Sequence, residues 1–406
     1  MASSDAPRRL YPALILTVAA VLRLAVVLAA TRGASVAWFF STGAELGNLA
    51  ESLRTGHGFS SPFGGATGPT AFLAPGYPAF VAAIFAVFGP YTHASALLIM
   101  LLQALFGVAT VFMLMSLARP VFGDTAANLA GLIWALCPFA WFIPTLFWES
   151  SLSILLATSI LALALAARGR HTLTRWLLMG LVAALTLAIN PSLLPILAGY
   201  YGWAIYQARH QSLRAPASGF LLCLLLSAPW VIRNAAQLHA FIPLRTNAGY
   251  ELWQGNRPGA DGFFEVPLHP TVNRDQFNRY ASLGELAYMR EKSAQAKAAI
   301  AADPAHFATL TARRALWFWT GRARVPRKLE MAYIITITTF GLVGLALLWF
   351  RDRALTIYFL LPLLLFPLPY YITHPDVRFR MILDPMLVAL AAYALTRKAR
   401  NKSKSL

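Results

Sequence analysis

The chain has 406 residues, of which 58% are hydrophobic and only 12% are charged. A soluble domain carries about 25% charged residues, so this composition excludes an ordinary soluble protein and indicates one that lies in a membrane. The net charge of +18 does not indicate a nucleic-acid partner, because the basic residues are dispersed among apolar segments rather than gathered on one polar face.

Motifs for several common enzyme chemistries are missing from the sequence. There is no GxxxxGK[ST] loop, HExxH, CxxC or GxSxG pattern, so nucleotide hydrolysis, zinc-protease and serine-hydrolase chemistry lack their minimum parts. The two cysteines, Cys137 and Cys223, lie inside apolar runs, and we expect no disulfide framework.

Apolar runs recur along the chain, and a membrane helix needs roughly 20 such residues. The first run follows Arg8 and Arg9 and continues past Arg23, which favours an uncleaved first helix over a signal peptide. The later uncharged runs are residues 94–118, 125–148, 150–167, 176–208, 215–232, 331–350 and 354–373.

Prolines decide how two apolar regions are interpreted. Asn190-Pro191 breaks the long run 176–208 and predicts a helical hairpin, whereas Pro75 and Pro78 favour a re-entrant or interfacial helix within 72–88. The short loops rich in Arg and Lys then all fall on one side, which the positive-inside rule makes cytoplasmic. The sequence therefore predicts an all-α polytopic membrane protein, a bundle of about ten transmembrane helices with both ends inside.

This topology leaves two long segments on the extracytoplasmic side, a first loop at 32–93 with interfacial helices and a cap loop at 233–330. Residues 279–300 predict one polar-faced helix, and Asp303-Pro304 predicts the start of another. The aromatic and basic residues of that later helix favour either the membrane interface or a small cap packed on the bundle. We expect residues 1–406 to form one membrane domain.

The chain has only 16 acidic residues, so candidate catalytic carboxylates are few. Glu149 lies at the junction of two apolar runs, where a charge is costly and usually faces a cavity. Glu45 lies in the pattern ELGNLAESL shortly after the first span, where a carboxylate can act as general base. The alternatives are a solvated turn for Glu149 and the solvated face of a surface helix for Glu45.

Arginines near the ends of two predicted spans suit a phosphate. Arg378 and Arg380 precede the last span and Arg233 ends the seventh, and guanidinium groups bind phosphate oxygens and stabilise a phosphate leaving group. An arginine that only reaches toward lipid headgroups is the alternative for each.

The order of these features resembles the GT-C superfamily of membrane glycosyltransferases, particularly the bacterial branch related to protein O-mannosyltransferases and lipid A aminoarabinose transferases. The most specific stretch is GHGFSSPFGGATGPTAFLAPGYPAFVAAIFAVFG, which is similar to the first extracytoplasmic loop of that branch. WESSL, the NPS turn at Asn190, APWVIRN, FIPLRTNAGYELWQGN and RFRMILDP follow in the expected order.

The resemblance implies a glycosyltransferase of the EC 2.4 class in the bacterial inner membrane with an extracytoplasmic active site. It implies a polyprenyl-phosphate sugar as donor, an acceptor hydroxyl on a lipid, glycan or protein, and single displacement with inversion. By position Glu45 is the base, and Glu149 competes because Glu45 lacks the adjacent acid found in many relatives. The substrate pocket is expected to include His57, Tyr77, Asn190, Asn247, Trp253, Asn256 and His374.

No ligand-spaced cluster predicts a metal site, although acids of the outer loops leave a divalent metal open, and no other cofactor is predicted. The partners are membrane lipids and the two substrates, without nucleic acid. The alternatives are a transporter or flippase of a lipid-linked substrate and a non-catalytic scaffold. A transporter is expected to show paired repeats and charges near the membrane midplane, whereas only Arg23 interrupts a span deeply here.

Overall fold

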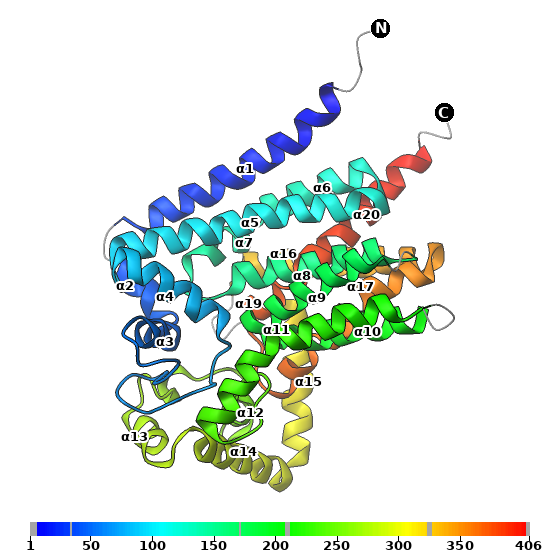
Figure 1. Cartoon of the computed structure of the whole chain (residues 1–406). Helices are drawn as coiled ribbons and strands as arrows, with labels where there is room; N and C mark the ends of the chain where they lie inside the picture. The colour runs from blue at the N-terminus through cyan, green and yellow to red at the C-terminus, as the bar shows by residue number, and fades with distance from the viewer. Residues whose placement is uncertain (1–5, 33–34, 170–171, 208–211, 323–326, 403–406) are drawn as a thin grey trace.

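A computed structural model describes residues 6–32, 35–169, 172–207, 212–322 and 327–402, and Figure 1 shows it. Regular structure in these residues is helical apart from one isolated bridge between Ser60 and Pro69. The predicted all-α class is therefore confirmed.

The longer helices form a bundle, and α1 begins and α20 ends at the same end of it in Figure 1. The segments of this bundle are α1 (Ala6–Ala30), α5 (His93–Phe122), α6 (Asp124–Ala135), α7 (Pro138–Phe142), η1 (Ile143–Thr145), α8 (Ser150–Ala167), α9 (Leu173–Ile189), η2 (Pro191–Leu193), α10 (Leu194–Gln207), α11 (Arg214–Leu238), α16 (Lys328–Arg351), α17 (Arg353–Leu365), α18 (Leu368–Ile372), α19 (Val377–Arg380) and α20 (Asp384–Lys402).

The remaining helices form what we call the cap. It consists of α2 (Ser35–Ser41), α3 (Ala44–Arg54), α4 (Gly76–Phe88), α12 (Ala248–Asn256), η3 (Val266–Leu268), α13 (Arg274–Leu283), α14 (Glu285–Ala302) and α15 (Pro304–Thr320), with their loops. In Figure 1 the helices of the two long loops lie at one end of the molecule, away from the start of α1 and the end of α20.

Six helices in the described residues are long and apolar enough to cross a membrane, and the bent pair α6 and α7–η1 makes a seventh if its halves, at 57°, form one span. This is fewer than the predicted number of about ten. The break at Asn190-Pro191 is confirmed, and it leaves α9 and α10 with only 17 and 14 residues. Residues 72–88 form no long span, because only the 13-residue α4 forms there.

Glycines bring the bundle helices close together. A Cβ on Gly180 of α9 would overlap the carbonyl of Gly219 in α11, and a Cβ on Gly344 of α16 would overlap the carbonyl of Leu390 in α20. Small residues at helix interfaces are typical of membrane bundles, where backbones pack closely.

Buried polar contacts join the two loops of the cap. The Glu285 carboxylate at the start of α14 accepts hydrogen bonds from Thr70 Oγ1, from the Ala71 backbone N–H, and from Thr246 and Tyr280 hydroxyls. Glu285 is only 5% exposed, so these bonds are made away from water. They fasten residues of the first loop to the second.

The prediction of a single helix at 279–300 is wrong, because this stretch contains the end of α13 and most of α14. Gly284, at φ +75°, separates α13 from α14, and few L-residues adopt that backbone conformation. The predicted start at Asp303 is confirmed, because the Asp303 carboxylate accepts from the His306 backbone N–H at 2.8 Å and Pro304 occupies the first turn. Leu310, Arg314 and Phe318 of α15 are buried, and α15 contacts α18, so this helix packs on the bundle.

Candidate functional site

Backbone contacts hold the first loop against the segment that carries Glu149. The Phe147 backbone N–H donates to Thr42 Oγ1 at 2.9 Å, and the Trp148 ring N–H donates to the Thr42 carbonyl. A Cβ on Gly43 would overlap the Phe147 carbonyl, so only glycine permits this approach. Glu45 begins α3 just after these contacts and Glu149 precedes α8, so the two candidate acids are placed by one tightly packed junction.

Glu45 faces a histidine of the cap. Its Oε1 lies 3.6 Å from His269 Nε2, and the two side chains are 13% and 6% exposed. Burial lowers the pKa of His269, and the nearby Glu45 carboxylate opposes that change. A neutral imidazole beside a carboxylate at a nearly dry position is typical of an acid–base site.

Glu149 is influenced by the charges of two arginines and of the other candidate acid. Burial raises the pKa of Glu149, the charges of Arg378 and Arg245 oppose that rise, and the Glu45 carboxylate adds to it. The Arg245 guanidinium donates to Ser192 Oγ at 2.8 Å, which fixes it at the η2 turn. The charges of Arg245, Arg378 and Glu45 therefore all act on the Glu149 carboxyl.

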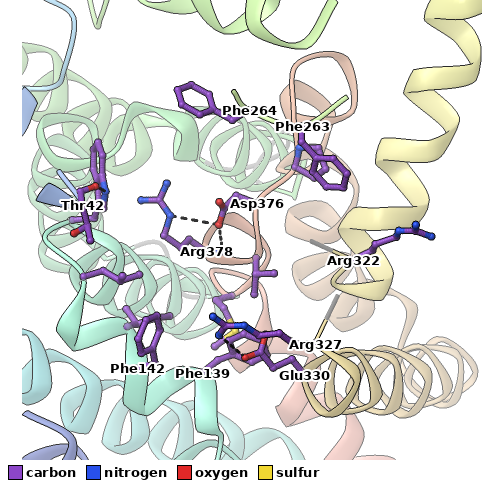
Figure 2. A pocket seen from close by; sticks show the side chains of 16 residues that line it. Thr42, Phe139, Phe142, Phe263, Phe264, Arg322, Arg327, Glu330, Asp376 and Arg378 are labelled. Carbon is purple, nitrogen blue, oxygen red and sulfur yellow. Dashed lines mark hydrogen bonds and ion pairs between the residues drawn. The ribbon is translucent and has the colours of Figure 1, made fainter. Parts of the chain in front are cut away.

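Arg378 lines a cavity of about 480 Å³. Its guanidinium stacks on the Trp148 ring at 5.0 Å, and its Nε lies 3.4 Å from Asp376 Oδ1. Figure 2 shows Arg378 and Asp376 inside this cavity, with Phe264 and Phe263 on one side and Phe139 and Phe142 on another. The full lining is Thr42, Phe139, Phe142, Ile143, Leu146, Trp148, Phe263, Phe264, Arg322, Arg327, Glu330, Pro375, Asp376, Val377, Arg378 and Met381.

The other two predicted phosphate-binding arginines hold the protein together instead of lining this cavity. Arg380 is buried, pairs with Asp384, and donates to Thr338 Oγ1 at 2.9 Å. Arg233 donates to the backbone carbonyls of Thr70 and Phe59. Their contacts are structural in this state, whereas those of Arg378 leave it at the cavity wall.

A second histidine–carboxylate pair also lies near Phe264. His374 Nδ1 is 3.7 Å from Glu251 Oε2, and Asn247 donates to Glu251 Oε1 at 2.8 Å. The Phe264 ring centroid lies 5.1 Å from the His374 ring and 5.8 Å from the His269 ring. Burial lowers the pKa of His374. Of the predicted pocket residues, Asn247 and His374 are thus beside the site.

The remaining predicted pocket residues are scattered. Asn190 caps η2 and donates to Ser153 Oγ at 3.2 Å, and Asn256 donates to the Ile372 carbonyl at 2.7 Å. Tyr77 and Trp253 are buried, Trp253 against Lys292. His57 is exposed and contacts Thr55, so its side chain lies at a solvated surface position.

Sequence reasoning missed His269, Arg245 and Glu251. All three lie in the cap loop at 233–330, and no spacing along the chain connects them to Glu45 or Glu149. Pro270 directly after His269 marks a turn, which is the single local signal near that histidine.

The described residues contain no group of three or more His, Cys, Asp or Glu side chains placed to hold a metal ion. Each of the two histidine–carboxylate pairs supplies only two such groups.

Fold and site together define an integral membrane protein with a polar site of acids and arginines between an apolar helix bundle and a cap. Residues 73–232 match the family model described as dolichyl-phosphate-mannose-protein mannosyltransferase. None of the curated protein sequences matches the chain.

Solved structures share the fold at low sequence identity. The oligosaccharyltransferase AglB from Archaeoglobus fulgidus, in complex with an inhibitory peptide and a dolichol-phosphate, is similar at TM-score 0.55 and 13% identity, over 100% of this chain and 52% of that chain. The Archaeoglobus fulgidus oligosaccharyltransferase in complex with Zn and sulfate is similar at a TM-score of 0.52 and 15% identity, over 94% of this chain and 48% of that chain. ArnT from Cupriavidus metallidurans bound to undecaprenyl phosphate has a weaker likeness that does not by itself show the fold, with a TM-score of 0.41 and 16% identity over 98% of this chain and 79% of that chain.

The chain therefore has the GT-C fold of membrane glycosyltransferases, as the resemblance of the sequence implied. It spans about half the length of the oligosaccharyltransferase chains that it matches.

Proposed function

We propose that the protein transfers a sugar from a polyprenyl-phosphate carrier to an acceptor hydroxyl on the extracytoplasmic face of a bacterial inner membrane. The observation that carries the proposal is the cavity that joins an apolar wall to the Arg378 guanidinium, beside the junction that places Glu45 and Glu149. A lipid carrier has the same two parts, a hydrocarbon chain and a phosphate.

The apolar wall of the cavity suits the carrier chain near its phosphate. Phe139, Phe142, Ile143 and Leu146 of α7, η1 and the following turn form this wall, and Phe142 is among the exposed large apolar side chains of the bundle. Arg378 faces the same space, where its charge would bind the phosphate and stabilise it as it leaves the sugar. The oligosaccharyltransferase structure that shares this fold holds a dolichol-phosphate, which supports this class of donor.

In the proposed reaction the acceptor oxygen attacks the anomeric carbon from the face opposite the phosphate. The new carbon–oxygen bond forms as the bond from the anomeric carbon to the phosphate oxygen breaks, and a carboxylate takes the hydroxyl proton. A single displacement of this kind inverts the anomeric centre. Arg378 stabilises the negative charge on the departing polyprenyl phosphate.

The test is mass-detected sugar transfer in proteoliposomes that contain defined polyprenyl-phosphate sugars and a panel of lipid, glycan and peptide acceptors. Glu45→Gln is expected to lower kcat by about 10²- to 10⁴-fold, because a general base contributes that much. Glu149→Gln is the parallel variant. Glu291→Gln is the control, because that acid pairs with Arg279 at the surface of the cap at 2.6 Å.

Unchanged transfer by both site variants would refute the catalytic role of these acids. Movement of the lipid-linked sugar across the bilayer without a new glycoside would instead support the transporter alternative.

A further inference from the structure

We propose that His269 is a positioning residue that holds the Glu45 carboxylate, and that Glu45 rather than Glu149 is therefore the base. This inference rests on the proposed function and names the acid that accepts the acceptor proton. It adds a residue of the cap to a reaction centre otherwise built from the first loop and the bundle.

The contacts of the imidazole fix which nitrogen carries its proton. The Thr271 backbone N–H donates to His269 Nδ1 at 3.4 Å, and the Thr271 hydroxyl lies 2.7 Å from the same atom. A backbone N–H only donates, so Nδ1 is an acceptor in the neutral ring. The proton is then on Nε2, which is the atom that faces Glu45.

The backbone and the neighbouring rings keep the imidazole in place. The His269 backbone N–H donates to the Val266 carbonyl at 2.9 Å, and the His269 carbonyl accepts from the N–H groups of Val272 and Asn273 at 2.9 and 2.8 Å. The rings of Phe63, Phe264 and Tyr250 lie 5.3, 5.8 and 5.8 Å from the imidazole centroid. The ring therefore has little freedom to turn its Nε2–H away from Glu45.

A neutral N–H donor suits a general base better than a cation does. A guanidinium or ammonium at this distance would stabilise the carboxylate charge strongly and reduce its affinity for a proton. In the described part of the chain His269 is the single basic side chain within 4.0 Å of Glu45, whereas the nearby Glu51 pairs with Arg54 at 2.7 Å. Glu45 is thus oriented without being neutralised.

The separation of 3.6 Å is longer than a formed hydrogen bond. Catalytic contacts are often long before substrate binds and tighten in the complex. The Glu45 side chain, on the first turn of α3, is expected to rotate toward the fixed imidazole when substrate binds. By contrast, no side-chain hydrogen bond caps α8 at Glu149.

The first test compares His269→Leu, His269→Gln and Thr271→Val in the full-length protein in the same proteoliposome assay. The His269→Leu change is expected to lower kcat by about 10- to 100-fold with little change in the KM for the lipid donor, because misplacement of a reacting group costs this much. His269→Gln is expected to retain most of kcat, because its amide N–H replaces Nε2–H. Thr271→Val removes the hydroxyl that contacts His269 Nδ1. The kcat of this variant is expected to lie between those of His269→Leu and His269→Gln.

Equal losses of kcat in His269→Gln and His269→Leu would overturn the proposal, as would a change confined to KM. A merely structural histidine gives no reason for rescue by glutamine.

The second test does not depend on activity. Glu45→Gln, His269→Leu and the double variant are unfolded by heat in detergent. The decrease in the midpoint of unfolding of the double variant is expected to be smaller than the sum of the decreases in the two single variants. His306→Leu is the matched control, because His306 is exposed on α15 and its shift should add to that of Glu45→Gln. Additive changes in the unfolding midpoint for Glu45→Gln and His269→Leu would show that the two side chains do not interact and would overturn the proposal. Absence of sugar transfer by the wild-type protein, with coupling preserved, would refute the proposed function alone.

Discussion

Where helices of the bundle meet, glycines let main-chain atoms of neighbouring helices approach closely, as at Gly180 with Gly219 and Gly344 with Leu390. Where the two loops of the cap meet, buried hydrogen bonds to the Glu285 carboxylate join them instead. The bundle is thus specified by shape and the cap by polar pairing. The candidate site lies on the boundary between them.

This difference follows from the surroundings of each layer. Lipid gives helices no hydrophobic reason to associate, so close backbone packing stabilises the bundle. The loops of the cap carry many backbone donors and acceptors, and those that are buried must be paired. The two layers should therefore respond to different substitutions.

The largest effect on stability is expected in the cap, from Glu285→Ala. This change leaves the Ala71 backbone N–H and the hydroxyls of Thr70, Thr246 and Tyr280 without their acceptor. Hydrogen bonds to a charged group contribute about 1.5–3 kcal/mol each, so we expect the cap to lose at least about 3 kcal/mol. Limited proteolysis should cut within 233–330 while the bundle stays intact.

The control for Glu285→Ala is Glu291→Ala on the same helix, where the paired Arg279 is exposed. Equal protease sensitivity in the two variants would show that Glu285 does not stabilise the contact between the two loops of the cap.

A smaller effect is expected in the bundle, from Gly344→Ala. The added methyl group would overlap the Leu390 carbonyl, so α16 and α20 must move apart. Overpacking of this kind costs about 1–3 kcal/mol. A lower midpoint of thermal unfolding in detergent, with the protease pattern of the cap unchanged, is the expected result.

Gly202→Ala in α10 is the matched control, because a Cβ there meets nothing within 4 Å. Alanine is the better helix former, so this variant should be neutral or slightly stabilised. A similar loss in both variants would mean that helix propensity, rather than close approach, determines the effect.

The smallest effect is expected at the boundary, from Arg378→Lys. Lysine keeps the positive charge at the cavity but loses the planar group that stacks on Trp148 and can bind two phosphate oxygens. We expect kcat/KM for the lipid donor to fall about tenfold, or about 1.4 kcal/mol, without a change in the stability of either layer. A thermal shift as large as that of Gly344→Ala would assign Arg378 a structural role instead.

Local features of the fold could be predicted from the sequence, whereas features that depend on distant contacts could not. Asn190-Pro191 breaks a helix by its own chemistry, and Asp303 caps one, so both were predictable. Gly284 was missed as a break because an isolated glycine also occurs inside helices.

The site shows the same limit. Glu45 and Glu149 stood out because acids are rare in this chain, and Arg378 because it precedes a span. Arg380 precedes the same span, yet it pairs with Asp384 and does not line the cavity. His269 could not be connected with Glu45, because that contact exists only after the two loops have folded together.

The glycine at position 43 has a consequence for how the site tolerates change. It lets the chain before α3 touch the carbonyl of Phe147, so main-chain atoms set the distance from the first loop to the segment that carries Glu149. Exchange of side chains elsewhere in the cap should therefore leave the spacing between these two segments unchanged.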